Sequence, residues 1–225
     1  HSGRFIIEQF LEKIGSSSDT DSFSIDDELV FCSFNCQKFD PNSPNPYTPA
    51  AYTWPSDMSD AAQQKLRAEL QRLIKLLKMG SWIYNIETRF ATDGKPYIME
   101  VSPRGGGNRL SEILKMATNQ DLIANNINAA LRLPMFSMQD PTYNGFWAEV
   151  VVHSNKSGKY NGLKIVDDVK PFVVQEDMWV KVGDNVEAFT GANQTIGTLV
   201  LRFFDRAKMD VALNNISSWL TVDII

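Results

Sequence analysis

The chain has 225 residues, of which 43% are hydrophobic, and it carries a formal net charge of −5. This length holds one large or two modest domains, each with a core of its own. The acidic balance, without a Lys/Arg cluster, argues against a nucleic-acid surface, and no apolar run approaches the length of a membrane span. We therefore expect a soluble protein with neither nucleic acid nor membrane as a partner.

The first quarter of the chain is predicted to form strands followed by a loop. Residues 4–11, Arg-Phe-Ile-Ile-Glu-Gln-Phe-Leu, have the composition of a strand with one exposed glutamate. Two further strands are predicted at residues 21–25 and 29–38, on either side of an acidic turn. Residues 40–55 contain five prolines and no periodicity, which indicates an ordered surface loop or an active-site flap.

Two patterns in this region do not form a site of their own. Asp19 and Asp21 do not begin a calcium loop, because the residue at the turn position, Ser24, is not glycine. Cys32 and Cys36 would lie about 13 Å apart along a strand, too far to form a disulfide. With no signal segment, reduced cysteines predict a cytoplasmic location.

A helix is predicted at residues 56–79, and Gly80 is its stop signal. One face of this helix is apolar and is expected to pack into the core. That face carries Leu66, Leu70, Leu73, Ile74 and Leu77.

A β-hairpin is predicted from Trp82 to Ser102, because Asp93-Gly94 lies between two strand-like runs and is typical of a type I′ turn. A two-residue turn there pairs residues whose numbers sum to 187. In this register the proline at position 96 falls in a pair without hydrogen bonds, where its missing N–H is tolerated. The same register places Glu87 directly opposite Glu100.

Two carboxylates in that arrangement repel each other, since their Cβ atoms lie about 4.5 to 5.5 Å apart. The pair is tolerated if one carboxyl is protonated or if a cation lies between them. Mg²⁺ is bound by one or two protein carboxylates together with water and phosphate oxygens, so a nucleotide is implied. The alternative is that Glu87 and Glu100 both lie on a solvated face.

The residues after Glu100 lead from a strand through a glycine loop, Ser-Pro-Arg-Gly-Gly-Gly-Asn, into a predicted helix. Backbone amides of such a loop, together with a helix N-terminus, form an anion site, and Arg104 adds a fixed positive charge. Three glycines before a helix are often only a tight turn. The loop becomes informative because it follows the paired glutamates.

The remainder of the chain is predicted to contain two helices and several short strands. One helix spans residues 119–131 and ends before Pro134; its buried residues are expected to be Leu122, Ile123, Ile127, Ala130 and Leu131. Strands are expected at 146–152, 163–166, 179–182, 195–203 and 221–225, and a helix at 205–220. His153 is expected to be structural or solvated.

The segments Asn85–Arg89, Asp93–Lys95 and Ile98–Arg104 resemble the metal-binding end of ATP-grasp ligases, in the carboxylate-amine ligase branch that includes L-amino acid ligases, biotin carboxylase and carbamoyl phosphate synthetase. The family pattern is a Glu, a hairpin, and then Glu-x-Asn-Pro-Arg followed by glycines. Ser102 stands where the family usually has Asn. The resemblance implies an α+β ATP-grasp fold, an antiparallel or mixed sheet with flanking helices and a small β-rich C-terminal lobe. It divides the chain into a partial ATP-grasp domain at 1–134, from the adenine hinge strand onward, and a small α+β lobe at 145–225.

The resemblance also implies cofactors and residue roles. ATP and Mg²⁺ are the implied cofactors, with Mn²⁺ as an alternative metal. Arg104 would steady the transferring phosphoryl group or the tetrahedral intermediate. The other implied roles are metal ligation by Glu87, Glu100 and Ser102, acyl-group binding by Gly105, Gly106 and Gly107, and adenine binding by Glu8, Gln9, Phe10 and Leu11.

The function implied by the resemblance is ATP- and Mg-dependent joining of a small-molecule carboxylate to an amine through an acyl phosphate. A homodimer is left open. The resemblance does not include the family's N-terminal domain or the hairpin whose lysines cover the ATP phosphates, so we expect the chain to be a fragment that is inactive alone. Two alternatives remain: a catalytically silent nucleotide-binding module and, less favoured, a biotinyl- or lipoyl-like carrier or structural domain, whose lysine would have to lie on a hairpin tip.

Overall fold

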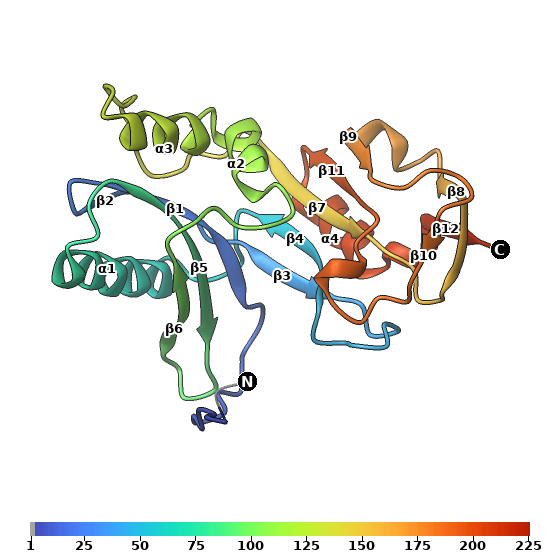
Figure 1. Ribbon diagram of the computed structural model, residues 1–225, viewed down its shortest axis with the longest axis horizontal. Coiled ribbons are helices and arrows are strands. Elements are labelled where there is room, and N and C mark those ends of the chain that lie inside the picture. The colour runs from blue at the N-terminus through green and yellow to red at the C-terminus, as the bar shows by residue number, and fades with distance from the viewer. Residues whose placement is uncertain (1–2) are drawn as a thin grey trace.

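The computed structural model describes residues 3–225, and within them the strands form three antiparallel sheets. The first sheet has the strand order β2-β1-β5-β6 and lies at the left of Figure 1. Its strands are β1 (Ser18–Ile25), β2 (Glu28–Cys32), β5 (Trp82–Phe90) and β6 (Pro96–Ser102). Helix α1 (Asp60–Leu77) packs on one face of this sheet, and the site described below lies on the other.

The second sheet joins strands from both halves of the chain in the order β3-β4-β7-β11-β9. Its strands are β3 (Cys36–Phe39), β4 (Pro49–Trp54), β7 (Phe146–Val152), β9 (Val173–Met178) and β11 (Gly197–Phe203). Helix α2 (Leu110–Thr118) packs with both sheets in one core, which includes Phe23, Leu114 and Trp147. Because β4 pairs with β7, the division into 1–134 and 145–225 stays a prediction.

The third sheet is small and has the order β10-β8-β12. Its strands are β8 (Gly158–Ile165), β10 (Asn185–Val186) and β12 (Leu220–Ile224), and it shares a core with α4 (Arg206–Asn214) and the second sheet. The short helices η1 (Lys170–Phe172), η2 (Ala192–Gln194) and η3 (Ile216–Ser218) lie in the connections. Among the helices of residues 3–225, none combines the length and the apolar composition that crossing a bilayer requires.

The helix predicted at 56–79 is confirmed as α1, and its apolar face is largely as expected. Ser59 accepts a hydrogen bond from the amide of Ala62 and so caps the first turn. Leu66 and Ile74 are buried against the first sheet. Leu77, the last residue of the helix, is 63% exposed, so its predicted burial is wrong.

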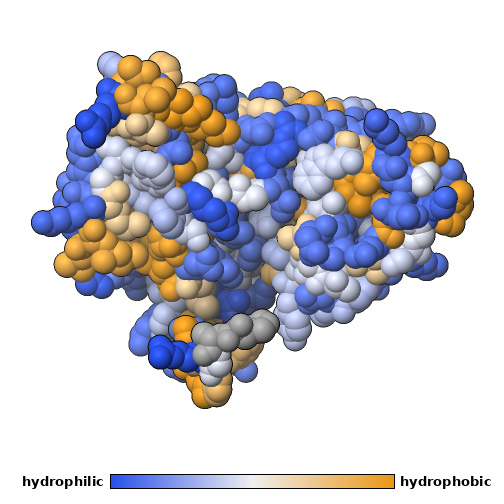
Figure 2. All heavy atoms as spheres, viewed as in Figure 1, coloured by the Kyte–Doolittle hydropathy of each residue, from blue (hydrophilic) through white to orange (hydrophobic). Residues whose placement is uncertain are grey.

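The helix predicted at 119–131 is confirmed as α3 (Leu122–Leu131), but most of its predicted buried face is wrong. Leu122 is buried, whereas Ile123, Ile127 and Leu131 are exposed. Figure 2 shows hydrophobic surface in the region of α3. The buried side is instead shared by Asn125, whose amide bonds both backbone groups of Phe136. A polar side chain can be buried when its amide is hydrogen-bonded within the protein, and the apolar periodicity of the sequence does not reveal such a residue.

Several predicted strands are also wrong. Residues 4–11 form no strand and are mostly exposed, because no strand of the described chain pairs with them. The strand predicted at 29–38 is divided into β2 and β3, which belong to different sheets. Residues 49–54 of the predicted flap form the buried strand β4, and residues 179–182 form no strand, whereas β9 ends just before them.

Candidate functional site

The hairpin at the centre of the prediction is formed by β5 and β6, but its turn differs. The amide of Gly94 donates to the carbonyl of Ala91 at 2.9 Å, and the amide of Ala91 donates to the carbonyl of Lys95 at 2.9 Å. Gly94 has a φ of 77°, while Asp93 has no positive φ. The turn is therefore a three-residue loop that ends in a left-handed glycine, and the predicted type I′ turn is wrong.

The altered turn shifts the register near the tip by one residue, so that Phe90 pairs with Pro96. An irregularity leaves Met99 without a partner and restores the predicted register beyond it. Glu87 therefore pairs with Glu100, as predicted. Pro96 has no N–H to donate and therefore has to lie in a pair without hydrogen bonds. It does so opposite Phe90, as observed, and would also do so opposite Ala91, as predicted.

The pair of glutamates belongs to a polar face on the side of the first sheet away from α1. Strand β1 pairs with β5 so that Asp19 lies opposite Glu87, and the adjacent row is Asp21, Asn85 and Ser102. The amide nitrogen of Asn85 donates to Asp19 at 2.8 Å and to Asp21 at 3.3 Å. We name the face formed by Asp19, Asp21, Asn85, Glu87, Glu100 and Ser102 the acidic face.

The electrostatics of this face favour a bound cation. Burial, together with the nearby Glu100 carboxylate, raises the pKa of Glu87 against the opposing effect of Arg89. The hydroxyl of Ser102 donates to the Oε1 atom of Glu100 at 2.5 Å, which holds that carboxylate in place. A cation between the two glutamates would remove their repulsion.

Asp19 adds a third carboxylate that the sequence analysis missed as a site residue. Burial raises its pKa to about 6, with a further contribution from Glu87, although the hydrogen bond from Asn85 opposes the shift. The backbone of Asp19 is fixed by the side-chain amide of Asn35, which bonds both its N–H and its carbonyl. The signal was present as the Asp-x-Asp spacing, which places both side chains on one face of a strand.

The glycine loop is attached to the same face through Asp21. The amide of Gly106 donates to Oδ1 of Asp21 at 2.7 Å, and the hydroxyl of Ser111 donates to Oδ2. A Cβ atom at Gly106 would lie 2.6 Å from Leu110 Cδ1 and 2.7 Å from Asn85 Nδ2, so this position has no room for a side chain. The amide of Gly106 is thus engaged within the protein, and acyl binding by Gly105, Gly106 and Gly107 stays a prediction.

Arg104 lies at the start of this loop and is exposed. Its guanidinium donates to the carbonyl of the adjacent Gly105 at 2.9 Å and forms no ion pair within residues 3–225. The side chain can therefore turn toward an anion above the loop. Its catalytic role stays a prediction.

The predicted adenine-binding residues lie in the unpaired N-terminal segment. Glu8, Gln9 and Phe10 are exposed, and the carbonyl of Leu11 accepts a hydrogen bond from Arg89 at 3.0 Å. This contact holds the end of the segment beside β5, two residues from Glu87. Adenine binding there stays a prediction.

A buried carboxylate on β7 was missed altogether. Glu149 is fully buried, and neither of its side-chain oxygens has a hydrogen-bond partner among the described residues. Burial raises its pKa well above the ordinary value, against the influence of nearby Arg109. That arginine instead bonds Glu112 and, at 3.0 Å, Asp177. A single Glu in the run Trp-Ala-Glu-Val-Val-Val was the available signal.

The residues of the acidic face fit a magnesium ion that is shared with a nucleotide. Within residues 3–225 no three His, Cys, Asp or Glu side chains are grouped to hold a metal by themselves. Mg²⁺ does not require such a group, because it keeps several waters and binds one or two carboxylates plus phosphate oxygens. Glu87, Glu100 and the hydroxyl of Ser102 are oxygen ligands of the required kind.

No protein-family model matches the sequence, and no curated protein sequence matches it. Solved structures do match the fold. Phosphoribosylglycinamide synthetase from Anaerococcus prevotii superposes with a TM-score of 0.78 at 18% identity, over 96% of this chain and 55% of that chain. L-amino acid ligase from Bacillus licheniformis gives 0.80 at 17% identity, with 96% and 55% covered. Biotin carboxylase from Campylobacter jejuni gives 0.67 at 15% identity, with 97% and 48% covered.

At these identities the likeness is one of fold. The matched structures are ATP-grasp proteins, so the predicted α+β ATP-grasp fold is confirmed. The chain spans about half the length of these structures. Activity, substrates and partners of the whole protein are therefore matters for proposal.

Proposed function

We propose that this chain is the metal- and nucleotide-binding part of an ATP-dependent ligase that joins a carboxylate to an amine through an acyl phosphate. The observation that carries the proposal is the pairing of Glu87 with Glu100 beside the glycine loop. Two facing carboxylates on a hairpin whose second strand leads into a glycine loop and a helix N-terminus suit a metal-bound polyphosphate.

The matched structures support the same kind of chemistry. Two of them are ligases or synthetases by name, an L-amino acid ligase and a phosphoribosylglycinamide synthetase. A biotin carboxylase domain from Hydrogenobacter thermophilus was solved with MgADP and bicarbonate. We therefore assign ATP and Mg²⁺, with Mn²⁺ as an alternative, and small-molecule carboxylate and amine substrates to the proposed activity.

The residues of this chain would act mainly by positioning and by charge. Glu87 and Glu100 would hold Mg²⁺, which neutralises phosphate oxygens when bound. The hydroxyl of Ser102 orients the Glu100 carboxylate, and the Asp21 carboxylate holds the glycine loop beside the acidic face. Arg104 would supply a positive charge where negative charge develops during phosphoryl transfer.

Nucleotide binding tests the metal assignment directly. We expect calorimetry to detect Mg-dependent ATP binding by the full-length protein, and the Glu87→Gln/Glu100→Gln variant to weaken it by at least about 10- to 100-fold, the range found for disturbed metal sites. The matched control is Glu69→Gln/Glu187→Gln, which changes two exposed glutamates outside the site. Equal affinity of the two double variants for ATP in the presence of Mg²⁺ would contradict the assignment of Glu87 and Glu100 as metal ligands.

Phosphate release separates a ligase from a silent nucleotide-binding module. We expect release to depend on both a carboxylate and an amine in a screen with product mass spectrometry. Binding without any release, over a broad set of substrates, would favour the silent module. A carrier function is less favoured. The lysine considered for it, Lys208, which follows the strand-like segment 181–203, lies in α4 rather than on a hairpin tip.

We further propose that this 225-residue chain turns over little ATP by itself, because it spans about half the length of the matched structures. A steady-state ATPase assay tests this. Robust turnover by the chain alone, abolished in Glu87→Gln/Glu100→Gln, would contradict the proposal of low activity while supporting the metal site.

A further inference from the structure

A cavity of about 650 Å³ lies apart from the acidic face and shares no residue with it. It is bounded by the β3–β4 region and β7 on one side and by the end of α4, η3 and β12 on the other. Its volume falls within the range of roughly 300 to 1,000 Å³ that small-molecule sites occupy. Nothing in the proposed ligase chemistry uses this space.

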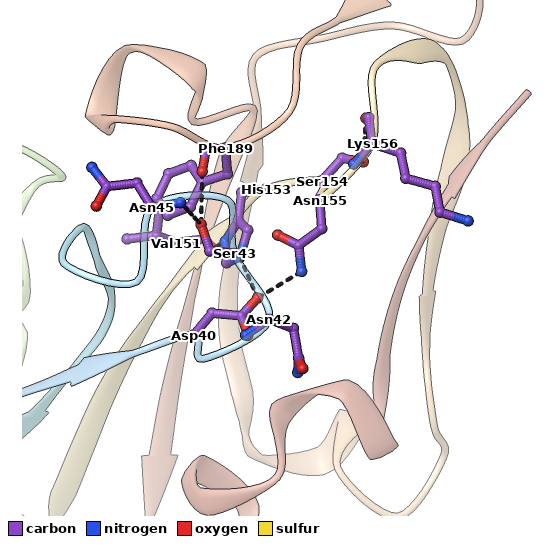
Figure 3. A network of polar contacts seen from close by, with 10 residues as sticks. All are labelled: Asp40, Asn42, Ser43, Asn45, Val151, His153, Ser154, Asn155, Lys156 and Phe189. Carbon is purple, nitrogen blue, oxygen red and sulfur yellow. Dashed lines mark hydrogen bonds and ion pairs between the residues drawn. The ribbon is translucent and has the colours of Figure 1, made fainter.

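One wall of the cavity is a polar network centred on Asp40 (Figure 3). Its carboxylate accepts hydrogen bonds from Asn155 Nδ2 at 2.8 Å, from His153 Nε2 at 3.2 Å and from the amide of Asn42 at 2.8 Å. The ring of His153 stacks on Phe189, with centroids 4.0 Å apart. Three chain segments distant in sequence are thus fixed around one carboxylate.

A second set of bonds makes this wall rigid. The hydroxyl of Ser43 donates to the carbonyl of Phe189 at 2.7 Å, and the amide of Phe189 donates to the carbonyl of Ser154 at 2.9 Å. The hydroxyl of Ser154 donates to the carbonyl of Lys156 at 2.7 Å. A wall held before any ligand arrives reduces the ordering cost of binding.

The ring of His153 connects two parts of this network. Its Nδ1 atom lies 2.7 Å from the carbonyl of Val151. Its Nε2 atom lies 3.2 Å from the carboxylate of Asp40. The histidine is therefore held on both sides, and the Asp40 carboxylate has partners on its own segment and on residues 153–155.

The other charged side chains of the lining are Lys38, Lys156 and Asp223. Neither lysine forms an ion pair in the part of the chain that the structure describes. Asp223, on β12, accepts a hydrogen bond from Asn161 at 2.8 Å, and Asp40 accepts three. The cavity is therefore lined by two ammonium groups without an ion-pair partner and by two carboxylates that already accept hydrogen bonds within the protein.

Most apolar side chains of the lining come from α4, η3 and β12. They are Leu213, Ile216, Leu220, Val222 and Ile224. Polar residues of the same elements lie between them, namely Asn214, Asn215, Ser217, Thr221 and Asp223, and Ala50 and Val150 add apolar surface from the second sheet. A space with apolar surface and a few converging polar groups is the usual form of a small-molecule site.

We infer that this cavity is a second ligand site, which takes a small organic anion with an apolar body, a carboxylate or a phosphate monoester. The anionic group would bind the ammonium groups of Lys38 and Lys156, and the apolar body would lie against the α4, η3 and β12 wall. The site requires nothing of the nucleotide, so it stands whether or not the proposed ligase function does.

Calorimetric titration with octanoate and with octyl phosphate tests the inference on the full 225-residue chain. Both anions should bind, whereas octylammonium, which has the same apolar chain and the opposite charge, should not. The Lys38→Gln/Lys156→Gln variant should weaken binding at least about tenfold, because charge-assisted contacts are lost. The two anions distinguish a carboxylate ligand from a phosphate ester by their relative affinity.

Two further variants separate this site from general adsorption. The Lys65→Gln/Lys208→Gln variant removes the same charge at exposed helical positions away from the cavity and should bind octanoate like the unchanged chain. Thr221→Trp places a large ring in the cavity from β12 and should abolish binding, while thermal unfolding verifies that the variant is folded. Absence of binding, equal binding of octylammonium, or equal loss in both lysine pairs would overturn the inference.

Discussion

At the scale of single residues, the site region contains carboxylates whose charged forms are disfavoured by burial. Asp19 and Glu149 both have raised pKa values because burial disfavours their charged forms. Burial raises the pKa of Asp21 as well, but hydrogen bonds from Ser111, Gly106 and Asn85 oppose that shift. Glu149 has no such donor among the described residues.

Glu149→Gln should stabilise the protein at neutral pH. The pKa of Glu149 is higher in the folded than in the unfolded chain, where it is near 4.5. The folded state therefore holds the extra proton, and stability falls as pH rises above the unfolded value. Glutamine resembles the protonated acid and removes this dependence, so the variant should lose less stability than the unchanged chain between about pH 5 and 8.

Urea unfolding across that pH range measures the effect. Glu187→Gln is the matched control, since the side chain of Glu187 is exposed. A Glu149→Gln variant that is less stable than the unchanged chain at every pH would show that the carboxylate is paired and charged in the folded state.

Gly106→Ala should disturb both stability and the glycine loop. The new Cβ would meet Leu110 Cδ1 at 2.6 Å and Asn85 Nδ2 at 2.7 Å, and overpacking of this kind costs roughly 1–3 kcal/mol. Gly107→Ala is the internal control, because nothing lies within 4 Å of its Cβ position. Chemical denaturation should separate the two variants, and equal stability would contradict the tight packing of Gly106 against the acidic face.

At the scale of elements, local patterns predicted what local physics determines. The position of Glu87 opposite Glu100 was predicted from one short segment that forms a hairpin, although the predicted turn type and the predicted register at its tip were wrong. Two errors cancelled, because the longer loop and the unpaired Met99 each shift the register by one residue. Neither the longer loop nor the unpaired residue has a sequence signal stronger than the Asp-Gly pair.

Features that depend on distant partners could not be predicted in the same way. Asp19 acquires its role only when β1 pairs with β5, and Glu149 only when β7 is covered by α2 and the first sheet. The strand expected at residues 4–11 failed for the converse reason, since its composition suits a strand but no pairing strand adjoins it. Composition determines a propensity, whereas burial and pairing are settled by the whole chain.

The turn of the hairpin can be tested as an element. Gly94 has a φ of 77° and no neighbour within 4 Å of a Cβ, so any loss on substitution reports backbone strain alone. Gly94→Val should destabilise the protein by about 1–2 kcal/mol or more, while Gly94→Asn should cost less, because Asn tolerates the left-handed region. Equal midpoints in thermal unfolding for the two variants would contradict the left-handed glycine at this position.

At the scale of the whole molecule, the second sheet crosses the boundary that the sequence suggested. β4 from the first part pairs with β7 from the second, and Trp54 lies opposite Trp147 in that ladder. The core that contains both tryptophans also includes Phe23 of the first sheet and Val200 of β11. The parts before and after residues 134–145 therefore share one sheet and one core.

This arrangement predicts a single cooperative unfolding transition for the chain. Trp82 lies in the first sheet and Trp219 in the core beneath the third, so variants that keep one of these tryptophans report on opposite ends of the molecule. If the shared sheet couples both ends, their fluorescence midpoints in urea should coincide with each other and with the loss of circular dichroism. Separated midpoints would mean that residues 1–134 and 145–225 unfold independently. The β4–β7 ladder would then be a weak contact between two domains, with the acidic face carried by the first alone.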